Sequence, residues 1–225
     1  MRYLGNKTKL LHFIEKVIDK HKIKGEIFAD LFAGTGSVGD YFKSNYTVVA
    51  NDFMYYSYIF NYAKLLNDSI PTFETFKTKY SSDVFEWLNK KSFSPNSHFF
   101  IYNNYTPVGG RMFFSEENGL QIDGIRITIE ELYRDKIITE AEYYFLLASL
   151  LESVTKVSNT SGTYEAFFKF WESRASKKLI LKPLEFSHSK FSAKNTIFNS
   201  DSNSIIRKIK GDILYIDPPY SVTQY

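Results

Sequence analysis

The fold prediction starts from Glu26-Ile27-Phe28-Ala29-Asp30-Leu31-Phe32-Ala33-Gly34-Thr35-Gly36, which occupies residues 26–36 of the chain. The residues up to Phe32 form a short apolar run typical of a buried strand, and two closely spaced glycines interrupt it directly afterwards. A helix is expected from Ser37 onward. A strand, a glycine loop and a helix in this order are what a cofactor-binding site at the edge of a sheet requires.

Further strands and helices are expected on both sides of this stretch. Apolar residues at helical spacing, with lysines between them, predict an amphipathic helix at residues 7–22. A second strand at 46–50 runs into Asn51-Asp52-Phe53 and then into a tyrosine-rich helix, which completes a β-α-β unit. Strand character returns at 196–198 and at 212–216. These patterns predict an α/β fold with a Rossmann-like parallel sheet.

The middle of the chain follows a different pattern, because helical signals replace strand signals from about residue 72 to 178. Thr139 and Glu142 form a capping box, and residues 115–117 and 163–165 look like two further helix starts. We therefore predict two parts. Residues 1–71 and 179–225 form an α/β domain, and residues 72–178 form a mainly helical insertion.

Composition excludes several kinds of site. The 225 residues include no cysteine, so disulfides, thiolate chemistry and cysteine zinc sites are ruled out. The four histidines lack the spacing of metal ligands, and no metal is expected. No apolar run approaches a membrane span and the first residues lack a secretory signal, which favours the cytoplasm. The net charge of +3 is compatible with a polyanionic partner without establishing one.

The tetrapeptide Asp217-Pro218-Pro219-Tyr220 follows the last expected strand. Its two prolines fix the turn and remove two N–H donors, so carbonyl oxygens can project as acceptors. If the Asp217 carboxylate and the Pro218 carbonyl accept both hydrogens of an adenine amino group, the nitrogen lone pair becomes available to a methyl donor. Tyr220 would then stack on a base rotated out of the duplex. The alternative is an ordinary turn beside a surface tyrosine.

The glycine loop suits a cofactor that contains an amino acid. Gly34 and Gly36 permit close backbone approach, and the N-terminus of the next helix offers N–H donors to a carboxylate. Asp30 at the strand end can hold an ammonium group. An ordinary strand-to-helix turn is the alternative.

Four other residues each have two interpretations. Asp52 lies 22 positions after Asp30, where an acid can reach ribose hydroxyls, but it can equally cap a helix. Phe53 can cover an adenine ring or pack in the core. Lys7 can lie beside the cofactor carboxylate, contact DNA or simply be solvated at a helix start. Asp201 can accept a hydrogen bond from a cofactor adenine or be a plain loop aspartate.

Taken in order, the motifs RYLGNK at 2–7, DLFAGTGSVG at 30–39, NDF at 51–53 and DPPY at 217–220 resemble the Dam-like DNA adenine methyltransferases. In that family a target-recognition region is inserted before the catalytic motif, as the long helical interval is here. The motif matches lie near the two ends of the chain. Residues 109–115 and 159–164 in the middle also look like restriction-associated members of the group.

The resemblance implies transfer of a methyl group from S-adenosylmethionine to adenine in double-stranded DNA, within a restriction-modification system. Aspartate rather than serine at position 217 favours adenine over cytosine. The implied catalytic residues are Asp217, Pro218, Pro219 and Tyr220. The implied cofactor-binding residues are Tyr3, Lys7, Asp30, Phe32, Ala33, Gly34, Thr35, Gly36, Asp52, Phe53 and Asp201. Candidates for contact with phosphates or bases are Arg111, Arg126, Arg174 and nearby lysines.

The sequence departs from the family at its end, because members continue past the catalytic motif with further strands. We therefore expect a chain truncated after that motif, whose last strand is an edge that invites a second polypeptide to complete the sheet. Two other functions stay open. One is a non-catalytic subunit, or half of a split enzyme, that binds S-adenosylmethionine or DNA for a partner; the other is methylation of RNA or of a protein amide.

Overall fold

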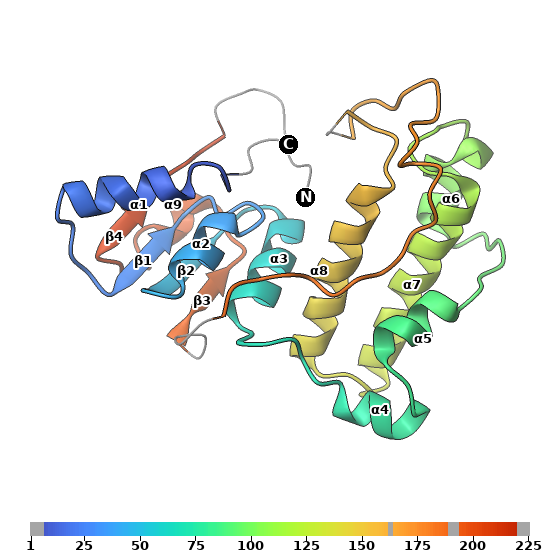
Figure 1. Cartoon of the computed structure of the whole chain (residues 1–225), viewed down its shortest axis with the longest axis horizontal. Helices are drawn as coiled ribbons and strands as arrows, with labels where there is room; N and C mark the ends of the chain where they lie inside the picture. The colour runs from blue at the N-terminus through green and yellow to red at the C-terminus, as the bar shows by residue number, and fades with distance from the viewer. Residues whose placement is uncertain (1–6, 162–163, 189–193, 220–225) are drawn as a thin grey trace. The chain divides into compact units, whose positions relative to one another are not determined.

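The computed structural model describes residues 7–161, 164–188 and 194–219. The chain divides into two compact units, which are coloured along the sequence in Figure 1. Unit 1 contains Thr72–Leu184, and unit 2 contains Gly5–Pro71 together with Glu185–Tyr225. Each unit has its own secondary structure and is described separately.

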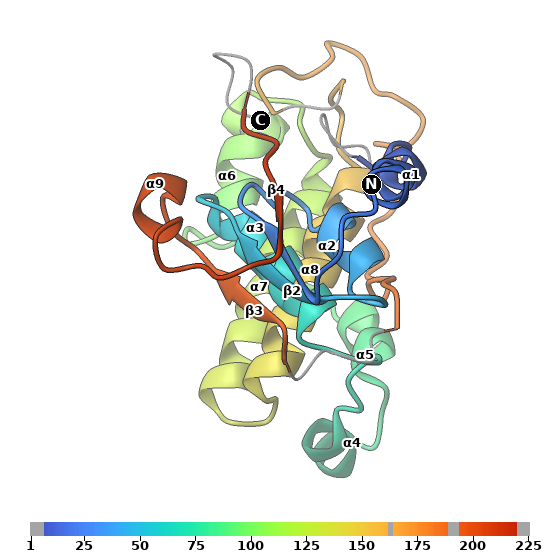
Figure 2. The same cartoon turned by 90° about the vertical axis from the view of Figure 1, so that its left-hand side faces the viewer.

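Unit 2 is built on a four-stranded sheet in the order β3-β2-β1-β4, with every pairing parallel (Figures 1 and 2). The predicted α/β fold with a partial Rossmann-like sheet is therefore confirmed. Apolar and β-branched residues dominate the strands because helices cover such a sheet. The strands are β1 (Ile27–Asp30), β2 (Thr47–Asn51), β3 (Thr196–Phe198) and β4 (Ile213–Tyr215).

The helices of unit 2 bury their apolar residues against this sheet. One cluster stacks Phe28 of the first strand on Phe42, with ring centroids 4.6 Å apart, and includes Leu11 and Ile18. A second cluster contains Val48 and Leu65. The helices are α1 (Leu11–Lys20), α2 (Ser37–Phe42), α3 (Tyr55–Leu65) and α9 (Ser202–Ile205).

Strand register brings the important loops to one edge of the sheet. Asp30 at the end of β1 is paired with Ala50 of β2 on one side and with Tyr215 of β4 on the other. Because the strands are parallel, the segments that follow them leave the same edge. The strand order changes direction between β1 and β4, and α/β proteins bind ligands at such points.

Unit 1 is helical, and its longest helices, α7 (Glu116–Arg134) and α8 (Glu140–Lys156), pack on each other. The predicted capping box begins α8: Thr139 N donates to Glu142 Oε2 at 2.7 Å, and Glu142 N donates to Thr139 Oγ1 at 3.3 Å. Ser115 caps α7, as its position predicted. The shorter elements are α4 (Glu74–Tyr80), α5 (Val84–Lys90), α6 (Phe100–Tyr105) and the 3-10 turn η1 (Pro107–Gly109).

The helix start predicted at 163–165 is wrong, although Thr163 itself lies outside the described residues. No helix occurs within residues 164–188. The buried Asn159 side chain donates to the carbonyls of Phe168 and Phe170, each at 3.0 Å, and holds them in a non-helical conformation. These side-chain contacts, 9 and 11 positions along the chain, outweigh the local capping signal.

None of the helices among the described residues is both long and apolar enough to cross a membrane. No group of three or more histidine and acidic side chains in the described ranges is arranged to hold a metal ion.

Candidate active site

The acceptor turn is defined here as Asp217-Pro218-Pro219. Its Asp217 side chain contacts Lys7 at the edge of the sheet where β1 and β4 end. Nζ of Lys7 lies 2.9 Å from Oδ2 of Asp217, and the two side chains are 18% and 25% exposed. Asp217 is the second residue after β4, whereas Lys7 precedes α1. Lys7 is therefore paired with Asp217, a position that none of the three interpretations from the sequence gave it.

Asp30 is the buried acid of this site, at 1% exposure. Its Oδ1 accepts a hydrogen bond from Phe32 N at 3.2 Å, whereas Oδ2 has no hydrogen-bond partner among the described residues. Burial raises the pKa of the Asp30 carboxyl to about 7, with the charges of Asp52 and Asp217 acting in the same direction and the Phe32 N–H opposing. A cation beside Oδ2 would reverse this effect, because it favours the ionised form.

Tyr215 lies within electrostatic reach of the same acids. Burial raises the pKa of its hydroxyl to about 12, and the charges of Asp217 and Asp30 add to that effect. Asp30, Asp52 and Asp217 thus form an acidic site around the ends of three adjacent strands. Such a concentration of negative charge favours a positively charged ligand group.

Both glycines of the loop adopt backbone conformations that favour glycine. Gly34 has φ of +52° and Gly36 has φ of +72°. A Cβ on Gly36 would lie 2.8 Å from Oδ1 of Asn61, whereas no heavy atom lies within 4 Å of the Cβ position at Gly34. The loop is therefore closed on the side of α3 and open at Gly34.

Asp52 connects this loop to the start of α3. Its Oδ2 accepts a hydrogen bond from Gly34 N at 2.8 Å, and its Oδ1 accepts one from Met54 N at 2.8 Å. Met54 rather than Asp52 occupies the N-cap position of α3. Each carboxylate oxygen keeps a second lone pair, so these bonds leave room for a ribose hydroxyl.

Two residues of α3 also hold the loop, and sequence reasoning missed both. Asn61 Nδ2 donates to the carbonyl of Gly34 at 3.0 Å, and Lys64 Nζ donates to the carbonyl of Thr35 at 2.8 Å. The Oδ1 atom of Asn61 is buried without a hydrogen-bond partner among the described residues. The only available signal was polar residues three positions apart on a largely apolar helix.

The remaining predicted site residues differ in their surroundings. Phe53 is 70% exposed, so it does not pack in the core. Asp201 caps α9, because its Oδ1 accepts from Asn203 N at 2.9 Å and Ser204 N at 3.2 Å. Tyr3 and Tyr220 lie outside the described residues. Phe32, Ala33 and Thr35 belong to the loop segment after β1, and Pro218 and Pro219 are exposed beyond β4.

The three arginines suggested for DNA contact all have partners within unit 1. Arg126 pairs with Glu130 at 2.7 Å, and Arg111 donates to the carbonyl of Asn104 at 2.8 Å. Arg174 pairs with Glu172 at 2.7 Å and donates to the carbonyls of Thr155 and Thr160. Arg174 therefore helps to hold the helix-free segment 164–188 in place. Exposed lysines nearby are Lys169, Lys177 and Lys178.

The chemistry around the loop fits a cofactor that contains an amino acid. Asp30 Oδ2 is an unpaired buried acceptor suited to an ammonium group. The loop at Gly34 has space for a ligand, and Asp52 offers acceptor lone pairs beside it. The Asp217 carboxylate, beyond the adjacent strand β4, is a further hydrogen-bond acceptor near Asp30.

A parallel sheet with a glycine loop after β1, and acidic side chains at the ends of β1, β2 and the adjacent β4, is typical of α/β enzymes of the Rossmann-like class. The chain belongs to the D12 class N6 adenine-specific DNA methyltransferase family, whose model matches residues 3–225. This is the family group that the motif order resembled.

Three relatives illustrate the similarity. Modification methylase LlaI of Lactococcus lactis subsp. lactis is 60% identical over 226 residues, and the match covers 100% of this chain and 36% of the relative. Type II methyltransferase M.FokI of Planomicrobium okeanokoites is 43% identical, with coverage of 100% and 35%. Type II methyltransferase M.NlaIII of Neisseria lactamica is 41% identical, with coverage of 100% and 66%. The chain thus spans about a third of the length of the first two relatives.

Replacing Asp52 by alanine is expected to weaken methyl-donor binding by about 1–3 kcal/mol, because a charged acceptor beside the loop and its bond to Gly34 N are both lost. Isothermal titration calorimetry measures this change. Asp83→Ala is the matched control, since Asp83 also accepts from two backbone amides, at the start of α5 in unit 1. Equal donor affinity in both variants would make Asp52 a structural residue only.

Proposed function

We propose that this chain forms the donor-binding and catalytic part of a site-specific DNA adenine methyltransferase of the type II modification kind. S-adenosylmethionine is the proposed donor, and the exocyclic amino nitrogen of adenine in double-stranded DNA is the proposed acceptor. The observation that carries the proposal is the position of the Asp217 turn beside Asp30 and the glycine loop, at the ends of the adjacent strands β4 and β1. Two substrates bound there would have their reacting groups side by side.

Asp217 and Pro218 act on the target nitrogen. An adenine amino group is a poor nucleophile because its lone pair is delocalised into the ring. The Asp217 carboxylate and the Pro218 carbonyl accept its two hydrogens, which draws the nitrogen toward tetrahedral geometry and directs its lone pair at the methyl carbon. Fixed acceptors of this kind need little reorganisation during the reaction.

Lys7 orients the Asp217 carboxylate through Oδ2, at 2.9 Å. In the proposed mechanism the other oxygen, Oδ1, accepts from the target amino group. The ammonium also offsets part of the negative charge that Asp30, Asp52 and Asp217 concentrate at this edge. Lys7 is therefore proposed as a positioning residue for the acceptor turn.

Asp30, Asp52 and the loop hold the donor. Asp30 Oδ2 accepts from the ammonium, Asp52 accepts from the ribose, and the exposed Phe53 ring covers the adenine of the cofactor. Asp201 and Lys7 stay candidates for contacts with the cofactor adenine and carboxylate. When bound, S-adenosylmethionine supplies an electrophilic sulfonium methyl group.

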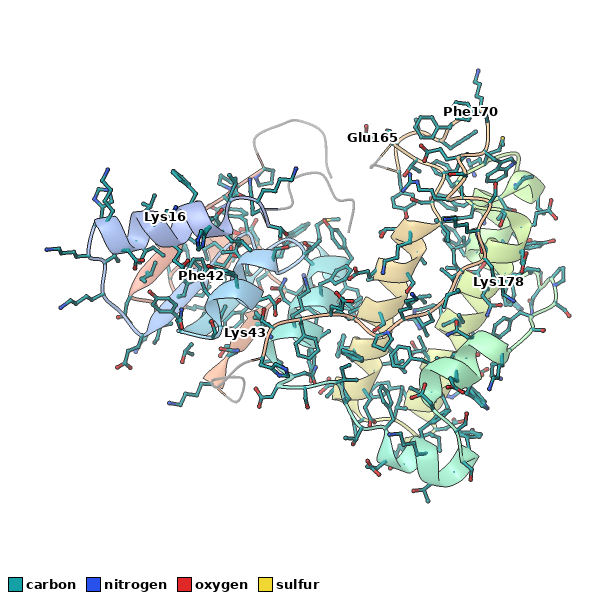
Figure 3. The ribbon with its side chains drawn as sticks, in the orientation of Figure 1. Lys16, Phe42, Lys43, Glu165, Phe170 and Lys178 are labelled. Atoms are coloured by element: carbon teal, nitrogen blue, oxygen red, sulfur yellow. The ribbon has the colours of Figure 1, made fainter. Side chains whose placement is uncertain are left out.

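Unit 1 is proposed to recognise the DNA. Phe170 is 65% exposed and Trp171 is 37% exposed. The exposed Lys169 and Lys178 belong to the same helix-free segment, on which Figure 3 labels Phe170 and Lys178. Lysines neutralise phosphates, and aromatic rings stack on unpaired bases. Work on DNA is also consistent with the cytoplasm, which stays the expected location.

The proposal is tested by incubating the intact protein with methyl-labelled S-adenosylmethionine and DNA, RNA or protein. Label in DNA, recovered as N6-methyladenine at a fixed sequence, is the expected result. Label in RNA or protein alone would overturn the proposal, and donor binding without any transfer would favour the non-catalytic subunit. Comparing the methyl-transfer activity of residues 1–225 with and without a second polypeptide that supplies further strands tests the expected need for such a partner.

A further inference from the structure

Lys43 is a buried cation that the proposed reaction does not use. Its side chain is 0% exposed, at the C-terminal end of α2 in unit 2 (Figure 3). Nζ lies 2.8 Å from Oδ1 of Asp40, donates to the backbone carbonyl of Lys64 and lies 4.6 Å from the centre of the Phe186 ring. Removing an ammonium from water costs several kcal/mol, so it is stable there only while these partners stay in place.

Asp40 extends this contact to the segment through which the chain returns from unit 1, defined here as the return segment, residues 185–188. Both Asp40 oxygens accept from Ser187 N, at 3.0 and 3.1 Å, and Oδ2 also accepts from Ser187 Oγ at 3.3 Å. The ring of His188 places Nδ1 3.0 Å from the carbonyl of Asp68, which lies shortly after α3. The return segment therefore forms hydrogen bonds with the rest of unit 2 at two points, Asp40 and Asp68.

Lys64 extends the same network toward the glycine loop. Its carbonyl accepts from Lys43, while its own ammonium donates to the carbonyl of Thr35 at 2.8 Å. Asn61, one helical turn earlier, donates to the carbonyl of Gly34 at 3.0 Å. Lys43 is thus linked through α3 to the loop carbonyls of Gly34 and Thr35, which accept hydrogen bonds from Asn61 and Lys64.

We propose that Lys43 is a positioning residue that joins the return segment to the glycine loop. By holding Asp40, Phe186 and the Lys64 carbonyl together, it keeps α2 and α3 in the arrangement in which the loop binds the donor. A displacement of the return segment then loosens the loop. The expected effect on donor binding rests on the proposed function.

Hydrogen exchange tests the link in the intact protein. Lys43→Met keeps most of the length of the side chain and removes the ammonium, while Asp40 keeps its bonds to Ser187. The amides of Gly34 and Gly36, bonded to Asp52 Oδ2 and to the Ala33 carbonyl, are expected to exchange at least about tenfold faster. Amides of β2 should keep their protection.

Two further variants complete the test. Lys16→Met changes an exposed lysine of α1 and should leave every rate unchanged (Figure 3). Phe186→Leu removes the ring from the return segment without exposing an unpaired charge, and it should accelerate the same loop amides even if Lys43→Met fails to fold. Unchanged loop protection in Phe186→Leu, or equal loss in β2, would overturn the link.

Kinetics then separate the link from the proposed function. In Lys43→Met the KM for S-adenosylmethionine should rise about tenfold, with kcat at saturating donor nearly unchanged, because only the donor-binding conformation is disfavoured. A fall in kcat alone would contradict the positioning role. Absence of methyl transfer in the unmodified protein would reject the proposed function, while the exchange rates would still decide whether Lys43 holds the loop.

Discussion

Replacement of Asp217 by alanine is expected to lower kcat for methyl transfer by about a thousandfold, with donor affinity within about threefold of the unmodified protein. In the proposed mechanism the Asp217 carboxylate acts on the target nitrogen and not on the donor. Its loss also removes one of the charges that raise the pKa of Asp30, which makes the ionised, ammonium-binding form of Asp30 easier to reach. Single-turnover kinetics and calorimetry measure the two effects.

Asp212→Ala is the matched control for this prediction, because Asp212 precedes β4 as Asp217 follows it. Its Oδ2 accepts from Glu26 N at 2.8 Å and Ile27 N at 3.0 Å, so its loss should affect stability and not the methyl-transfer step. A large loss of donor binding in Asp217→Ala, with kcat retained, would place Asp217 in the cofactor pocket instead.

Replacement of Asp30 by asparagine is expected to change stability and donor binding in opposite directions. The pKa of Asp30 is raised from 3.8 to about 7, so folding favours its protonated form. The favourable effect on folding is complete below pH 3.8 and is lost as pH rises through about 7. At about 1.4 kcal/mol per pKa unit, ionisation costs on the order of 4 kcal/mol at pH 8.

Asp30→Asn should therefore have a larger free energy of unfolding than the unmodified protein at pH 8, with the difference shrinking toward pH 4. Denaturant unfolding at several pH values measures this trend. If a cationic group of the protein paired with Asp30 and kept it ionised, Asp30→Asn would not have a larger free energy of unfolding at any pH. A difference independent of pH would thus contradict the assigned burial effect.

Donor binding should respond with the opposite sign. An ammonium beside Oδ2 requires ionised Asp30, so donor affinity of the unmodified protein should rise as pH increases through about 7. Asp30→Asn should bind about 10- to 100-fold more weakly at pH 8, through loss of a charged hydrogen bond. Asp123→Asn is the control, because burial also raises the pKa of Asp123, which belongs to unit 1 and is not among the residues proposed to bind the donor.

Local patterns in the sequence were sufficient for most of the secondary structure. The apolar run before Gly34 and the capping box of Thr139 and Glu142 each lie within a few residues, and both predicted elements are present. The order of the motifs was enough for the family, because a glycine loop and an acceptor turn after parallel strands must leave the same edge of the sheet. The roles of individual site residues stay predictions.

Contacts between distant residues settled what those patterns left open or missed. Lys7 meets Asp217 across almost the whole chain, and Ser187 reaches Asp40 from 147 positions away. Even over a shorter separation, Asn159 bonds to Phe168 and Phe170, 9 and 11 positions away, and keeps this segment out of the helix that its first residues suggested. Periodicity and capping depend on neighbouring residues, whereas the partner of a buried charge or amide is chosen by packing, which brings together residues with no shared local signal.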